Sequence, residues 1–285
     1  MCYLKAFDPT VAMVYFACIM SVSVFTSNPY LQACSLAGGI TALIFLKRLR
    51  CIKLLAGCAA VVAVMGLTNP LFVHRGLTEL FKIGDNYYTL EAMLYGVSLG
   101  CSIASLIIWF SVFNTVVTQD DILAVFGKHL PKTALIISMI LRFIPKLRRQ
   151  YTELYHAGIG SGESRRKSLH RSAGLFNACT AYEAESVLDI SSAMRARGYG
   201  IKRRTCASSG RFKKRDGFAI AFVLALSTVC YIYLGSGSLD YWYYPRLSPD
   251  GFEPIPIACF LGLCICPLFF IIKEKLIWKF YLAKN

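Results

Sequence analysis

Residues 89–116 decide the fold class, and they read TLEAMLYGVSLGCSIASLIIWFSVFNTV. Glu91 is the single charged residue among these 28 positions. A helix needs about 20 predominantly apolar residues to cross the hydrocarbon core of a bilayer. This segment is long enough to cross and also to tilt or to extend beyond the bilayer. The sequence therefore predicts a membrane-spanning helix here.

Apolar segments of similar character recur on both sides of this helix. Hydrophobic residues make up 56% of the 285 residues, and charged residues make up 16%, whereas soluble domains carry roughly 25% charged residues. The pattern predicts an all-α membrane protein with about six transmembrane helices. The predicted spans are residues 10–25, 30–46, 51–67, 89–116, 217–234 and 255–272.

The distribution of Lys and Arg predicts the orientation of these spans. With six spans, 28 of the 31 Lys and Arg residues fall on one side of the membrane and three (Arg75, Lys82 and Arg246) fall on the other. Cytoplasmic connections carry the excess of basic residues. We therefore expect a multi-pass protein of the plasma membrane with both termini in the cytoplasm. The net charge of +15 is explained by this bias, and nucleic acid is not an expected partner.

The chain divides into three predicted parts. Residues 1–116 hold four spans, residues 117–216 form a basic cytoplasmic region with 19 Lys and Arg residues, and residues 217–285 hold two spans and a tail. In the basic region, Pro131 suits the first turn of a helix, and Pro145 is expected to kink that helix. A second long helix is predicted over residues 172–197, where the small side chains of Ala193 and Ala196 would allow close crossing of another helix.

The end of this second helix carries the most distinctive residues. Gly198 suits the left-handed conformation that terminates many helices, and Arg197 precedes it. An arginine at a protruding helix end can dock on a partner, because its five donors engage carboxylates or carbonyl oxygens. Residues 195–198 alone leave a second reading open, in which Arg197 is an ordinary cation at a helix C-terminus.

The connections on the predicted outer side, residues 68–88 and 239–254, have their own character. The first contains Asn69-Pro70, and the second contains the aromatic run Tyr241 to Tyr244. Aromatic clusters of this kind settle at the headgroup level of a membrane. The run is therefore either an interfacial anchor or part of a ligand site.

Residues that would indicate catalysis or metal binding do not cluster. The 12 cysteines form no C-x-x-C pair and the four histidines are scattered, so we expect no metal site. The sequence contains no P-loop, H-E-x-x-H motif or nucleophile elbow. We therefore expect a non-catalytic chain that binds no cofactor itself.

The sequence leaves two alternatives from other functional classes open. One is an intramembrane transferase that uses Asp120-Asp121, although the second acidic cluster that usually holds Mg²⁺ is missing. The other is a membrane scaffold whose basic region binds anionic lipid or nucleic acid through charge.

Several ordered motifs, which together cover about residues 7–205, resemble the transmembrane T components of energy-coupling factor (ECF) transporters, the family that also contains cobalt permeases. One of them is SAMRARGYG at residues 192–200, at the end of the second predicted cytoplasmic helix. The others are NPLFVHRG at residues 69–76, LF at 80–81, WFSVFN at 109–114, FGKHLP at 126–131 and SMILRFIP at 138–145.

The resemblance implies a transducer rather than an enzyme. In such a protein Ala196, Arg197 and Gly198 would dock into one of two ATP-binding-cassette ATPase subunits, which hold ATP and Mg²⁺. Their movement would be passed to a separate membrane subunit, the S component, which binds a vitamin or a transition-metal ion. The choice of substrate would lie in that other chain.

One motif of the family is incomplete in this sequence. The family commonly has a first coupling arginine at the end of the preceding cytoplasmic helix, where this chain reads YHAGIG at residues 155–160. The resemblance therefore implies a first coupling region at His156, Ala157 and Gly158 without its arginine. Either another contact serves there, or Arg165 and Arg166 take its place.

Overall fold

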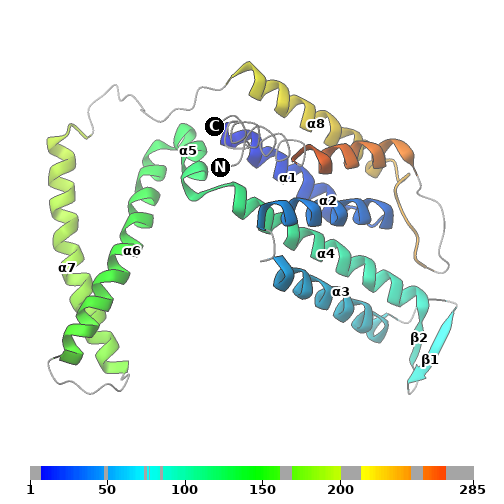
Figure 1. Ribbon diagram of the computed structural model, residues 1–285, viewed down its shortest axis with the longest axis horizontal. Helices are drawn as coiled ribbons and strands as arrows, with labels where there is room; N and C mark the ends of the chain where they lie inside the picture. The colour runs from blue at the N-terminus through cyan, green and yellow to red at the C-terminus, as the bar shows by residue number, and fades with distance from the viewer. Residues whose placement is uncertain are drawn as a thin grey trace, which may run out of the picture. The chain divides into compact units, whose positions relative to one another are not determined.

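The computed structural model describes residues 8–47, 51–73, 76, 78–83, 86–160, 169–199, 213–244 and 253–267 (Figure 1). The chain forms two compact units. The first unit comprises Met1–Asp121 together with Gly210–Asn285, and the second comprises Ile122–Ser209. We describe each unit by itself.

The first unit contains the apolar helices. Four helices in the described part of the chain are long and apolar enough to cross a membrane: α2 (Pro29–Lys47), α3 (Ile52–Phe72), α4 (Leu90–Val116) and α8 (Lys214–Gly235). Two further apolar helices are shorter, α1 (Pro9–Phe25) and the helix Pro254–Pro267. These six helices fall on the six predicted segments, although two are short, so six membrane crossings remain a prediction.

Helix α3 is longer than the sequence predicted. It continues to Phe72, so Asn69 and Pro70 lie inside the helix and not in an outer connection. The Asn69 side chain finds a partner there, because its Nδ2 donates a hydrogen bond of 2.6 Å to the carbonyl oxygen of Ala92 on α4. Because its amide nitrogen is hydrogen-bonded, this polar side chain can lie against a neighbouring helix at a low cost in free energy.

The connection after α3 holds a β-hairpin, so the described chain is not purely α-helical. Strand β1 (Glu79–Ile83) pairs antiparallel with β2 (Asn86–Thr89), and Lys82 lies opposite Tyr87. No strand was predicted from the sequence in this connection. The β-hairpin leads directly into α4, whose buried Glu91 accepts a hydrogen bond from the backbone N–H of Thr78 (3.2 Å).

Helix α4 is the centre of the first unit. Its Trp109 is fully buried, and its ring packs edge-on to Phe16 of α1 with the centroids 6.3 Å apart. The indole N–H donates to Ser35 of α2 (3.1 Å), and Ser35 in turn bonds Ser23 of α1 (2.8 Å). Polar side chains that bond across helices in this way hold membrane helices together.

The α3–α4 interface depends on two glycines four residues apart. A Cβ atom at Gly96 would lie 2.5 Å from the carbonyl oxygen of Met65, and one at Gly100 would lie 2.8 Å from Cα of Val62. The two backbones therefore approach as closely as they do because these positions lack side chains. This is the small-xxx-small arrangement of membrane helix pairs, and it was not predicted from the sequence.

The aromatic run after α8 is partly structural. Tyr243 is buried, and its hydroxyl donates to the carbonyl oxygen of Ser27 (3.1 Å). Burial raises the pKa of Tyr243, because the phenolate would lose its hydration. Trp242, by contrast, is 66% exposed, which suits an interfacial anchor.

The second unit is built from most of α5 (Gln119–His129), together with α6 (Pro131–Gly160) and α7 (Leu169–Ala196). Helix α6 is one continuous helix of 30 residues, and Pro145 lies inside it without ending it. Helices α6 and α7 form an antiparallel pair whose axes cross (Figure 1).

Candidate functional site

The C-terminal end of α7 is closed by a complete hydrogen-bonded cap. The N–H of Gly198 donates to the carbonyl of Arg195 (3.0 Å), and the N–H of Tyr199 donates to the carbonyl of Met194 (3.0 Å). Gly198 has a φ of +79°. These two bonds around a left-handed glycine define the Schellman motif.

The cap fixes the backbone that carries Arg197. The Arg197 N–H still makes a helical bond to the carbonyl of Ala193 (3.1 Å), and its side chain is exposed. Arg197 therefore projects from a hydrogen-bonded helix end rather than from a loop. Ala196 is also exposed, so the predicted triplet of Ala196, Arg197 and Gly198 lies at the surface of the second unit.

Helices α6 and α7 meet at a polar contact. The Lys146 Nζ lies 3.2 Å from Glu183 Oε1 and 3.3 Å from Oε2, and it donates to the hydroxyl of Ser186 (2.8 Å). Glu183 is 7% exposed and Lys146 is half-exposed. A carboxylate buried to this degree requires a charged partner, so Lys146 and Glu183 fix the register of the helix pair.

Apolar clefts lie on this helix pair beside Arg197. The larger has a volume of about 530 Å³ and is bordered by cations from both helices, Arg142 and Lys146 of α6 and Arg197 beyond α7. Its apolar lining comes from Met139, Phe143, Ile190, Ala193 and Met194. A smaller cleft of about 280 Å³ also borders Met139, Phe143 and Met194 and reaches Arg195 and Tyr199.

Ala193 and Ala196 occupy different surroundings. Ala193 lines the larger cleft, whereas Ala196 lines neither of the two clefts. The contact of Glu183 with Lys146 lies ten residues before Ala193, or about 15 Å along the helix. In this structure the helices meet near Glu183 and leave a cleft at Ala193, so close crossing at the two alanines remains a prediction.

Arg142 is a site residue that the sequence analysis did not single out. It borders the same cleft as Arg197. A signal was available in the SMILRFIP motif, which contains Arg142 and lies in the first half of the helix that runs antiparallel to α7.

The predicted first coupling region lies at the other end of the helix pair. His156 and Ala157 are exposed near the end of α6, and the last turn of that helix has no basic residue. Because α6 and α7 are antiparallel, these residues and Arg197 extend in opposite directions from the Lys146–Glu183 contact. Gly158 is described only as backbone within α6, and Arg165 and Arg166 lie outside the described residues.

In the acidic pair at the start of α5, Asp121 has a local role. Asp121 Oδ2 accepts from the N–H (2.9 Å) and from the hydroxyl (2.6 Å) of Thr118, the residue before the helix. This is the reciprocal half of a capping box. Within the residues that the structure describes, no three His, Cys, Asp or Glu side chains are placed to hold a metal ion.

No protein-family model matches the sequence. The chain is 28% identical over 169 residues to a putative ABC transporter ATP-binding protein of Bifidobacterium longum (strain NCC 2705). The match covers 55% of this chain, and the chain spans 22% of the length of that relative. With the apolar helices of the first unit, this similarity fits a membrane protein related to transport.

Proposed function

We propose that the chain is the transmembrane transducer of an ECF-type ABC importer. It would couple ATP hydrolysis by two cytoplasmic ABC ATPase subunits, which hold ATP and Mg²⁺, to movement of a substrate-binding membrane subunit. The importer would take up a vitamin or a transition-metal ion, and this chain would be neither an enzyme nor the principal substrate binder.

The Schellman-capped end of α7 is the observation that carries the proposal. A docking arginine is effective when its backbone is held in place, because less conformational entropy is lost on binding. Arg197 meets this condition and adjoins an apolar cleft with two further cations, Arg142 and Lys146. A partner segment that combines an apolar side chain with carboxylates or helix-end carbonyls suits such a surface.

The similarity to a protein named as an ATP-binding protein supports the same view. The present sequence has no P-loop, and the match covers 22% of the length of the relative. A membrane transducer joined in one chain to its ATPase would give a partial match of this kind. The similarity therefore favours a chain that works beside an ABC ATPase.

The geometry suggests how force would pass through the second unit. Arg197 lies about 21 Å along α7 from the Lys146–Glu183 contact, and His156 lies about 15 Å along α6 in the opposite direction. Two ATPase subunits that close on ATP would move the two ends relative to each other. The crossed helices would convert this closure into a tilt of the membrane helices and of the bound S component.

Charge reversal at Arg197 tests the proposal directly. In cells that carry the cognate ATPases, Arg197→Glu should abolish co-purification of an ABC ATPase with the tagged chain and reduce uptake to background. The same charge change at Arg148, which is exposed on α6 and borders neither cleft, is the matched control and should leave both intact. Normal ATPase recovery with Arg197→Glu would refute the docking role.

The same experiment distinguishes the transducer from the alternative, which is a membrane scaffold whose basic region binds anionic lipid. Binding by charge alone collapses with added salt, whereas a partner seated in an apolar cleft is retained better. Association that survives 0.5 M NaCl but is lost in Arg197→Glu supports the transducer. The scaffold is supported if the ATPase is lost from the tagged chain at high salt and if the Arg148 and Arg197 variants recover equal amounts of it.

A further inference from the structure

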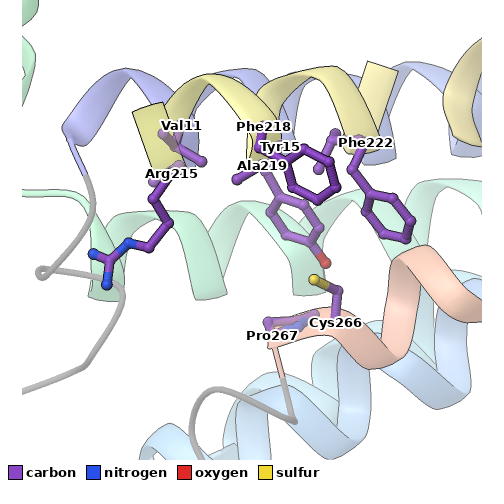
Figure 2. Close-up of a pocket in the computed structure, with 10 residues that line it drawn as sticks. Val11, Tyr15, Arg215, Phe218, Ala219, Phe222, Cys266 and Pro267 are labelled. Atoms are coloured by element: carbon purple, nitrogen blue, oxygen red, sulfur yellow. The ribbon is translucent and has the colours of Figure 1, made fainter. Parts of the chain in front are cut away.

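An apolar groove in the first unit lies between α1, α8 and the helix Pro254–Pro267 (Figure 2). Its volume is about 340 Å³. Helix α1 contributes Val11 and Tyr15, α8 contributes Phe218 and Phe222, and Cys266 and Pro267 complete the lining with Ala12, Ala219, Val223 and Arg215. Among the described residues of this lining, Arg215 is the one that carries a charge.

The groove has a different polarity at its wall and at one of its ends. The hydroxyl of Tyr15 donates to the carbonyl of Leu263 (2.9 Å), so this polar atom in the wall is bonded within the protein. The guanidinium of Arg215 extends at one end of the groove, away from the rings of Phe218, Tyr15 and Phe222 (Figure 2). The groove is thus apolar along its length and cationic at one end.

The position of Arg215 matches the expected membrane boundary. It lies in the first turn of α8, next to the exposed Lys213 and Lys214. Phe222 lies seven residues later, which is about 10 Å deeper along the helix. The carboxylate of Asp216 is buried outside the groove lining, and it accepts from the N–H of Lys213 (3.0 Å).

We propose that this groove binds one acyl chain of an anionic phospholipid, with the lipid phosphate paired to Arg215. A phospholipid offers an apolar chain to the aromatic wall and an anionic phosphate to the cationic end of the groove. An apolar helix of another membrane protein would cover the wall but would carry no charge complementary to the cationic end. Basic residues at the membrane boundary attract anionic lipid, and the groove converts this general attraction into a defined site.

Native mass spectrometry of the detergent-purified full chain tests the site. The protein is incubated with equal amounts of phosphatidylglycerol and phosphatidylcholine that carry the same acyl chains. We expect one phosphatidylglycerol to be retained per chain, roughly fivefold above phosphatidylcholine, as expected for one interfacial cation. Arg215→Gln should remove this preference, and Lys214→Gln, a neighbouring cation outside the groove lining, should keep most of it.

A second variant tests the groove without changing charge. Ala219→Trp places an indole in the groove and should reduce retention of both lipids while Arg215 stays in place. Circular dichroism and size-exclusion profiles that match the parent chain establish that each variant is folded. Equal retention of the two lipids by the parent chain, or unchanged phosphatidylglycerol retention in both Arg215→Gln and Ala219→Trp, would overturn the proposal and leave the groove to a partner helix.

Discussion

Gly198 is the residue on which the position of Arg197 depends. Its φ of +79° lies in the left-handed region, which costs an ordinary L-residue roughly 1–2 kcal/mol. The amide groups of Gly198 and Tyr199 both bond back into α7. A side chain at this position therefore strains the turn and loosens the residue before it.

Gly198→Ala should lower the local stability of the helix end by about 1 kcal/mol. We expect faster hydrogen exchange over residues 193–199 and several-fold weaker recovery of the ATPase, although no charge has been removed. Gly174→Ala is the matched control, because Gly174 lies inside α7 with open space around its Cβ position. That change should leave exchange at the helix end unchanged or slower, and equal effects of the two changes would argue against the cap.

Lys146 determines how α6 and α7 meet. Lys146→Met leaves the buried Glu183 without its charged partner and should destabilise the contact by roughly 1–3 kcal/mol. Limited proteolysis of the second unit should become faster, and the additional change Glu183→Leu should restore resistance. Arg149→Met removes an exposed i,i+4 pair with Glu153 (3.1 Å) and should change little. Equal sensitivity of the Lys146 and Arg149 variants would contradict this role.

At the scale of elements, the α3–α4 pair shows what small residues do in this fold. Helix α3 buries Cys58, Gly66 and Pro70, whereas Leu67 and Phe72 are 67% and 81% exposed. One narrow face therefore attaches α3 to α4, and the rest of the helix is left to lipid or to a partner. An interface of this kind tolerates little added volume.

Gly96→Leu should separate α3 from α4 and destabilise the protein by at least about 1–3 kcal/mol, the usual cost of overpacking. The reason is the 2.5 Å that an added Cβ would leave to the Met65 carbonyl. The melting temperature in detergent measures the effect. Gly57→Leu on α3, where the Cβ position is open, should leave that temperature nearly unchanged. A melting temperature for Gly96→Leu equal to that of the parent would show that the helices are not packed through this glycine.

The elements themselves could be predicted from the sequence where local signals were strong. Long apolar runs predicted α4 and α8 within a few residues, and helix-favouring residues predicted most of α7. The predicted span ended at residue 67, five residues before the end of α3 at Phe72. Asn69-Pro70 is typical of a turn, and the sequence does not show that Asn69 bonds Ala92 on the next helix. The β-hairpin was missed because two short strands leave a weak pattern between apolar segments.

Less of the candidate site could be predicted. The cap at Gly198 could be predicted, because a glycine after a helical segment commonly takes the left-handed conformation that ends a helix. The pairing of Lys146 with Glu183 joins residues 37 positions apart, and nothing local distinguishes these two charges from their neighbours. The cleft shared by Arg142 and Arg197 depends on that same pairing, so it became visible only in the folded helix pair.

At the scale of the whole molecule, the distribution of Lys and Arg predicts the membrane topology. Six crossings place the connection with the β-hairpin outside and the connection between α6 and α7 inside. A dual alkaline phosphatase and β-galactosidase reporter inserted near residue 85 should show phosphatase activity, and one inserted near residue 163 should show galactosidase activity. We expect these activities because 28 of the 31 Lys and Arg residues fall on the predicted cytoplasmic side. The same activity at both positions would contradict the predicted orientation.

The second unit also has consequences for the life of the protein in the cell. Large apolar side chains are exposed along both long helices, among them Ile136 (55%), Ile144 (55%) and Leu188 (71%). Patches of this kind on a chain by itself promote aggregation. A copy synthesised in excess of its partners would display them to chaperones and proteases, so quality control would hold the level of this subunit to the supply of the proteins that cover it.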